Sequence, residues 1–178
     1  DITAKAAPVD KGASGGKVGI GASVAVNITG NRSTAEIEDG AGLQGSGEVS
    51  LDAKAAHKAT TTAEAGSSGG VAITPALALA MLNNTSSARL GTGAALQGTG
   101  GVTLSATQSN TTVTIAKGSA AGETASVGAA VGLALVNDVT SATTERDILH
   151  ATGDVRFAAV GAAAHTPSAP SLLHIIRC

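Results

Sequence analysis

Acidic residues gather most densely at one point of the chain, where Glu36, Glu38 and Asp39 lie close together. On an extended strand Glu36 and Glu38 would share a face roughly 7 Å apart, a separation that suits the two carboxylates of an inverting glycosidase. A second copy of this segment holds Arg89 and Gly91 at the matching positions, and no aromatic side chain accompanies them to stack on a sugar. The residues therefore favour a solvated strand face over a catalytic pair.

The remaining residues with chemical potential form no recognisable site. Glu145, Arg146 and Asp147 are interpreted as a second solvated charged group, in which ion pairs contribute little. The histidines show no metal-ligand spacing and are expected to be scattered over the surface, and a single cysteine allows neither an internal disulfide nor a thiolate metal cage. These residues are His57, His150, His165, His174 and Cys178, the last interpreted as a free thiol. The sequence predicts no catalytic, cofactor-binding or metal-binding residue.

Threonine and asparagine allow two further interpretations. Regular ranks of threonine on a flat face can bind ice, but no strict Thr-x-Thr pattern recurs in every copy, so outward-facing strand residues are the simpler prediction. Asn31 and Asn84 are interpreted either as turn residues or as an asparagine stack inside the fold. The threonines in question are Thr60, Thr61, Thr62, Thr103, Thr107, Thr111, Thr112 and Thr114.

Composition limits both the core and the partners. Charged residues make up 13% of the chain, and Phe157 is the only aromatic residue, which excludes a standard mixed core. Lys and Arg number 11 against 13 Asp and Glu, without a basic run, which argues against nucleic-acid binding. The longest apolar run, 72–82, is too short for a membrane-spanning helix. The chain begins with Asp1, which we interpret as a processed or excised segment.

Apolar residues alternate with small ones at a period of two, which predicts β-strands. The pattern is longest in 18–28, 71–81 and 127–135, and shorter strands are expected at 34–38, 49–55, 102–106, 112–115 and 155–157. The residues expected to build the core are Val24, Val26, Leu77, Leu79, Leu133 and Leu135.

Internal repeats give the fold class. GAGLQGSGEVSLDA at 40–53 matches GAALQGTGGVTLSA at 93–106 with an offset of 53, and the same offset places Val18 on Val71, Asn31 on Asn84 and Ile37 on Leu90. A period this long, built from strands and glycine turns, predicts an all-β, parallel β-helix-like β-solenoid of about three ~53-residue repeats. Each repeat is expected to form two or three stacked layers, with corners at Gly30–Asn31, 39–47 and 66–70. The predicted divisions are a lead-in (1–17), three repeats (18–70, 71–126 and 127–159) and a non-repeat tail (160–178) with an extended linker at 165–170.

The repeats resemble those of large bacterial surface proteins. The strings that carry this resemblance are VGIGASVAVNITGNRSTAEIEDGA, VAITPALALAMLNNTSSARLGTG and VGAAVGLALVNDVTSATTERDI, within about 18–159. They are similar to repeats of leukotoxin-family filamentous adhesins and haemagglutinin-like autotransporter passengers. The resemblance implies a secreted, elongated passenger on the cell surface, and it transfers no site residue.

We therefore expect a non-catalytic structural or adhesive segment of a secreted bacterial surface protein, located outside the cell or on its surface. Stacked repeats would hold outward surfaces at fixed intervals for a host or cell-surface protein or glycan. The alternatives are a self-assembling fibril subunit that stacks end to end through open strand edges, a polysaccharide-cleaving β-helix enzyme and an ice-binding solenoid. The apolar end of the tail is interpreted as a cap, a chain contact or a non-native end.

Overall fold

The computed structural model describes residues 1–8, 12–43, 47–97, 100–149, 151–169 and 173–175. Every regular element within these ranges is a β-strand, so the predicted all-β class is confirmed. The strands are β1 (Ile2–Ala6), β2 (Ala13–Ser14), β3 (Val18–Ile20), β4 (Ser23–Ile37), β5 (Val49–Leu90), β6 (Leu96–Gln97), β7 (Val102–Thr144), β8 (Ile148–Leu149), β9 (Val155–Ser168) and β10 (Leu173–Ile175).

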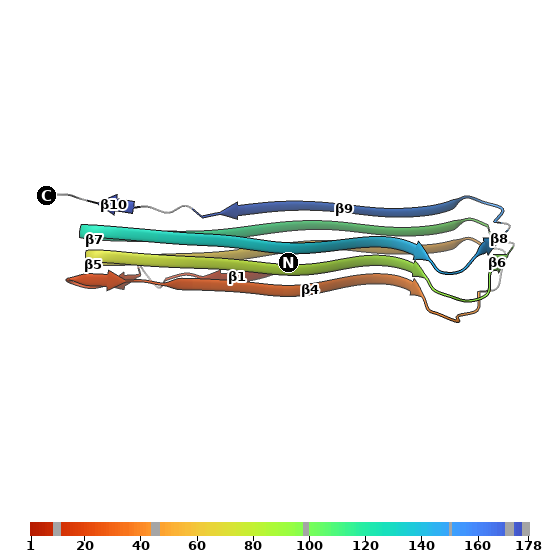
Figure 1. Ribbon diagram of the computed structural model, residues 1–178, viewed down its shortest axis with the longest axis horizontal. Coiled ribbons are helices and arrows are strands. Elements are labelled where there is room, and N and C mark those ends of the chain that lie inside the picture. Colours follow the sequence, from red (N-terminus) through yellow and green to blue (C-terminus); the bar gives the residue numbers. More distant parts are fainter. Residues whose placement is uncertain (9–11, 44–46, 98–99, 150, 170–172, 176–178) are drawn as a thin grey trace.

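Two very long strands, β5 and β7, organise a large parallel sheet. They pair with each other in parallel, β1, β2, β3 and β4 pair with β5, and β9 pairs with β7. β10 adds a short antiparallel pairing to β7, and β6 and β8 form a separate two-stranded sheet. The long strands run along the longest axis of the molecule (Figure 1).

Neighbouring strands are one sequence period apart. Val49 pairs with Val102, which in turn pairs with Val155, a constant offset of 53 residues. After a bulge between Gly69 and Val71 the offset between β5 and β7 becomes 54 residues. One period therefore contributes a single layer to the sheet, and the prediction of two or three layers per repeat is wrong.

β5 and β7 each reverse direction near their middle. Ser67 Oγ donates a hydrogen bond to Ile73 O at 3.2 Å, a contact that a straight strand does not allow between residues six positions apart. Gly69 at the bulge has a φ of 154°, and a Cβ there would lie 2.3 Å from Gly15 O. The predicted corner at 66–70 is thus confirmed. We call 49–69 and 102–122 the outgoing halves, and 71–90 and 125–144 the return halves.

The outgoing and return halves pack face to face. Ser86 Oγ in a return half donates a hydrogen bond to Ala53 O in an outgoing half at 3.2 Å. The core between them includes an alanine cluster near the corner at 66–70 and larger aliphatic residues near the loops. The alanine cluster is Ala25, Ala63, Ala65, Ala76, Ala78 and Ala116. The loop-side cluster is Ala53, Ala88, Leu90, Leu96, Val102, Leu104 and Ala106.

The residues predicted to build the core lie on the outer surface, so this prediction is wrong. The period of two is confirmed, but the large side chains lie on the outer surface and the small ones between them face inward. Ala78 and Ala80 are fully buried, whereas Leu77 is 39% exposed. The other predicted core residues are Val24, Val26, Leu133 and Leu135, which are exposed, and Leu79, which is half-buried.

The close approach of the two halves explains this inversion. A Cβ on Gly118 would lie 2.5 Å from Thr74 O and 3.0 Å from Ala129 O, so the two halves come close to backbone contact there. Interiors are close-packed, and a gap this narrow admits only glycine, alanine and other small side chains. Near the corner, leucine, isoleucine and valine of 71–81 and 127–135 therefore take the outward positions, whereas Leu82 and Leu90, farther along the return half, are buried.

Two predictions of local structure are wrong. β4 passes through Gly30 and Asn31 without a turn, because both residues pair with the matching positions of β5. The predicted linker at 165–170 begins inside β9, which pairs with β7 as far as Ser168. Each shorter strand predicted from the alternation lies within or overlaps a longer one. Leu172, Ile176 and Cys178 lie outside the described residues.

Candidate functional site

The most extensive exposed feature is an apolar surface on the outer side of β3, β4 and the return halves. Its side chains range from 38% exposed for Ile73 to 73% exposed for Ile28. Soluble chains rarely leave so many neighbouring aliphatic side chains in water without a partner. We call this surface the apolar plate. Its residues are Val18, Ile20, Val24, Val26, Ile28, Ile73, Leu77, Met81, Val127, Val131, Leu133 and Leu135.

The parallel register aligns the plate into columns. Val24 pairs with Leu77 and Leu77 with Val131, so side chains of like character meet across the strands. At a strand spacing of about 4.8 Å these side chains form one continuous surface. The columns are Ile20–Ile73–Val127, Val24–Leu77–Val131, Val26–Leu79–Leu133 and Ile28–Met81–Leu135.

The plate ends at a hollow of about 440 Å³. Met81 and Leu135 contribute its apolar lining, and Asn83 and Asn137 contribute polar lining. Asn137 Nδ2 donates a hydrogen bond to Asn83 Oδ1 at 3.0 Å, next to the last apolar column. This asparagine pair marks the boundary between the plate and the polar part of the same face.

The outer side of the outgoing halves has the opposite character. Lys54 Nζ forms an ion pair with Asp52 at 2.5 Å, and Lys117 Nζ lies 3.4 Å from a carboxylate oxygen of Glu64. The Lys54 ammonium lowers the pKa of Asp52 by hydrogen bonding. The molecule therefore presents one polar and one apolar outer face.

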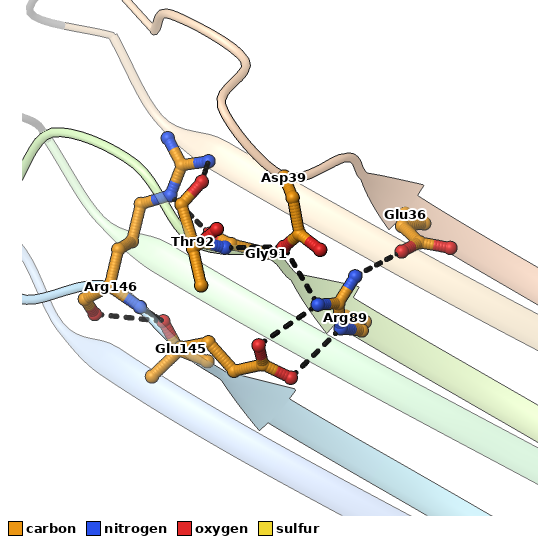
Figure 2. A network of polar contacts seen from close by, with 8 residues as sticks. Glu36, Asp39, Arg89, Gly91, Thr92, Glu145 and Arg146 are labelled. Atoms are coloured by element: carbon orange, nitrogen blue, oxygen red, sulfur yellow. Dashed lines mark hydrogen bonds and ion pairs between the residues drawn. The ribbon is translucent and has the colours of Figure 1, made fainter.

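A charged cluster lies beyond the asparagine pair, toward the loops (Figure 2). Arg89 donates hydrogen bonds to both carboxylate oxygens of Glu145 at 2.9 and 3.0 Å, to Asp39 at 2.7 Å and to Glu36. The four residues come from three successive layers, which the register brings side by side. Arg89 thus ties these layers together, and Glu36 and Asp39, two members of the acidic group found in the sequence, bind this guanidinium.

The hydrogen bonds of this cluster shift its acid–base equilibria. Thr92 N–H donates to Asp39 Oδ1 at 2.8 Å and is the main cause of the lowered pKa of Asp39. Arg89 lowers the pKa of Glu145, and the carboxylates together raise the pKa of Arg89. Glu38, the third acidic residue of the sequence group, is exposed after the end of β4. The arrangement stabilises charged carboxylates, which is the opposite of what a general acid requires.

The interpretation of 145–147 as a solvated group is wrong for Arg146. Its side chain is buried, with 6% exposure. The guanidinium donates hydrogen bonds to the carbonyl oxygens of Gly91 at 2.6 Å, Thr92 at 2.9 Å and Ala41 at 3.0 Å. Arg146 therefore joins three loop segments through backbone carbonyls, and the sequence gives no signal for this because the partners are not side chains.

An amide ladder runs through the interior. Asn31 Nδ2 donates to Asn84 Oδ1 at 2.7 Å, and Asn84 Nδ2 donates to Asp138 Oδ1 at 2.8 Å. Of the two interpretations offered for Asn31 and Asn84, the stack is confirmed and the turn is wrong. The ladder occupies one inward position in three consecutive layers and satisfies polar groups between the two halves.

Several polar side chains face inward, among them threonines that were expected on the outer surface. Thr61, Thr112 and Thr114 are buried, so the prediction of outward-facing threonine is wrong for these three residues. Gln108 and Asn110 are buried beside them. Within the described part of the chain, the buried side-chain atoms without a hydrogen-bond partner include both amide atoms of Gln108 and of Asn110 and the hydroxyls of the three threonines.

The histidines that the structure describes lie on different strands. His57 is half-buried, with an unpaired Nε2, and His165 is exposed on β9. No group of three or more His, Cys, Asp or Glu that could hold a metal ion occurs among the described residues. His150 lies outside the described residues, and His174 is in β10.

Sequence reasoning missed the apolar plate, although one signal was present. The residues between the large aliphatic ones are consistently small: Ala72, Ala76, Ala78 and Ala80 in one repeat, for example. When all side chains on one face of a strand are small, another backbone can lie close to that face. This signal could have placed the large side chains outside.

Comparisons with protein-family models, with curated proteins and with solved structures find no match. In the described ranges, the structure also contains no helix of the length and apolar character needed to cross a bilayer.

Proposed function

We propose that this chain is a non-catalytic structural and adhesive segment of a secreted bacterial surface protein, folded as a β-solenoid. The single observation that supports it best is the parallel register, in which β4, β5 and β7 stack position by position at offsets of 53 and 54 residues. Such stacking makes a rod that repeats its outward surfaces at fixed intervals. The extracellular location rests on the resemblance of its repeats to bacterial surface passengers.

Duplicating one period tests the solenoid. A second copy of 49–101 inserted after Gly101 is expected to add one layer, because the inserted strand can pair below with β5 and above with β7. Small-angle scattering should show growth of about 4.8 Å across the strands and none along them. Circular dichroism should stay β-type. An insert of the same residues in shuffled order is the control, and equal growth with both inserts would contradict the proposal.

The adhesive role is tested separately. Beads carrying the chain should attach to bacterial or host cells more often than beads carrying an unrelated β-protein of equal size. Incubation with polysaccharides should release no new reducing ends. Release that disappears in Glu36→Gln would show instead that the chain is an enzyme, and attachment equal to the control beads would remove the adhesive role.

A fibril subunit is a second candidate, supported by the open edges of the stack. β4 pairs with β5 on one side. Among the described residues, the free edge of the return half of β7 pairs with the short β10 alone, at Ala125–Val127. β4 of a second copy can pair there in the existing register, with its Val24 beside Val131. Its β1 must then move aside, because β9 already pairs with the part of β7 that β1 would meet. Open edges of this kind support end-to-end stacking.

An edge-blocking variant tests this candidate. Gly21 N–H donates to Ile73 O, and Gly91 N–H donates to Ile37 O, so odd-numbered residues of β4 direct their backbone groups toward β5. Thr34 is even-numbered, and Thr34→Pro therefore removes an N–H from the free edge alone. Electron micrographs over a concentration series should show filaments that lengthen for the unmodified chain and stay short for Thr34→Pro. Equal lengths would contradict end-to-end stacking.

A further inference from the structure

We propose that the apolar plate is an interface at which two copies of this chain pair face to face. This inference goes beyond the proposed adhesive role. It concerns the outer face on which the apolar plate lies, and not the ends of the stack or an external receptor. It depends on the composition, size and surroundings of the plate.

The plate is apolar throughout. Every outward position in 18–28, 71–81 and 125–135 holds Val, Ile, Leu, Met, Ala or Pro, and none holds a charged or hydrogen-bonding side chain. Ile28 is 73% exposed and Leu135 is 50% exposed, so at least half of each of these residues is open to solvent. Burying such a surface is favourable in proportion to its area.

The area suffices for a stable pair. Six outward positions on each of three strands, about 6.8 Å apart along the strand and 4.8 Å apart between strands, cover roughly 600 Å². Two plates together would bury roughly 1,200 Å², which reaches the range of specific protein interfaces. A patch of this size also lies at the upper limit for a monomer surface.

The side chains have the size that sheet-on-sheet packing requires. Two sheets pack about 10 Å apart when side chains from both faces interdigitate. Leu77, Met81 and Leu133 can fill such a space, whereas the alanines of the inner face cannot. The same surface on both copies is self-complementary, which a two-fold dimer requires.

The charges around the plate favour a second copy over a membrane surface. A helix or sheet that binds anionic lipid carries Lys and Arg beside its apolar face. Beyond the asparagine pair, this outer face carries two guanidiniums, Arg32 and Arg89, against three carboxylates, Glu36, Asp39 and Glu145. That end of the face is therefore net negative and would be repelled by anionic headgroups.

Sedimentation equilibrium tests the pairing, with Thr34→Pro present in every variant so that end-to-end stacking does not contribute. The Thr34→Pro chain should be a dimer that does not grow with concentration. Adding Leu77→Lys places a charge at the centre of the plate and should weaken dimerisation at least tenfold. Ala56→Lys, an exposed position of β5 on the opposite outer face, is the matched control and should leave the dimer intact. Circular dichroism and the thermal midpoint confirm that each variant is folded.

A cross-link gives a second readout that does not depend on affinity. In a Cys178→Ser background, Leu77→Cys lies near the centre of the plate and should form a disulfide-linked dimer on mild oxidation, whereas Ala56→Cys should not. A monomer at all concentrations, or equal loss of the dimer in Leu77→Lys and Ala56→Lys, would overturn the proposal. Binding of the monomer to phosphatidylcholine vesicles, lost in Leu77→Lys, would assign the plate to a lipid surface instead. Failure of pairing would leave the attachment of beads to cells unaffected, so the two proposals fail separately.

Discussion

The inner and outer faces of one strand segment, the return half of β5, differ in a way that reverses the usual arrangement. Its inner face holds Ala76, Ala78 and Ala80, which are buried, and its outer face holds Leu77 and Met81, which are 39% and 40% exposed. The usual expectation that large apolar side chains face inward depends on a space wide enough to hold them. In this chain the distance between the two halves decides which face becomes the core.

Glycine and alanine make this distance short. Gly118 faces the backbone of the opposite half so closely that a Cβ would meet Thr74 O at 2.5 Å. Close approach replaces the burial of large side chains by dense contact between backbone and methyl groups. Alternation of apolar and small residues therefore predicts a strand, whereas the distance to the opposite half determines which side of the strand is buried.

Changing the size of side chains on the inner and outer faces should have the largest effect on the free energy of unfolding. Ala78→Leu inserts three carbons into the alanine cluster and should lower the free energy of unfolding by about 3 kcal/mol. Leu77→Ala removes the same atoms from the half-exposed outer face and should cost about 1 kcal/mol or less. Urea unfolding, followed by circular dichroism at a concentration at which the chain is monomeric, measures both effects. A larger loss for Leu77→Ala would mean that the outer face is the core.

Replacing the neighbouring residues Asn83 and Asn84 in turn compares the outer and inner faces at one point of β5. Asn84→Ala breaks the interior ladder and leaves Asn31 Nδ2 and Asp138 Oδ1 without their partner, which should cost about 1–3 kcal/mol. Asn83→Ala removes an exposed hydrogen bond to Asn137 and should change the stability by about 0.5 kcal/mol or less. Thermal unfolding of the two variants side by side gives the measurement. Equal shifts in the thermal midpoint would show that the interior ladder adds no more stability than the exposed hydrogen bond.

Acid titration should give the smallest effect, confined to the charged end of the outer face. The folded state lowers the pKa of Asp39 and of Glu145, so their contribution to stability is present above the unfolded pKa near 4 and is lost as the pH falls through the folded pKa. Arg89→Gln should therefore reduce the loss of stability between pH 6 and about pH 2. Urea midpoints across this range measure it, with Lys58→Gln on the polar face as the charge-matched control. An unchanged slope in Arg89→Gln would assign the acid sensitivity to other carboxylates.

Much of the layer-to-layer alignment was predictable from the sequence. The offset of 53 predicts the pairing of Val18 with Val71 and of Asn31 with Asn84, and both pairs occur in the register. Repeated sequence locates such pairs because identical strands stack most favourably on each other in the same direction. The solvated acidic group was correctly placed at the surface, but its connection to Arg89 follows only from the three-layer stacking.

The buried side of each strand and the role of Arg146 could not be predicted in the same way. Alternation is symmetric, and nothing in a strand taken alone tells how near the opposite half lies. Arg146 binds the carbonyl oxygens of Gly91, Thr92 and Ala41, which any residue type would supply. The course of the chain through Gly30 also depends on a neighbour, because pairing with Asn83 keeps β4 extended where a glycine alone favours a turn.

The direction of the long strands has a mechanical consequence. The chain advances across the sheet by one layer per period, while its strands lie along the longest dimension of the molecule (Figure 1). A force applied along the strands loads the whole row of hydrogen bonds between β5 and β7 at once, in shear. A force across the layers, the direction in which a longer array would grow, opens the same bonds one after another from an end. An attachment built from this fold would therefore resist tension in one direction and peel readily in the other.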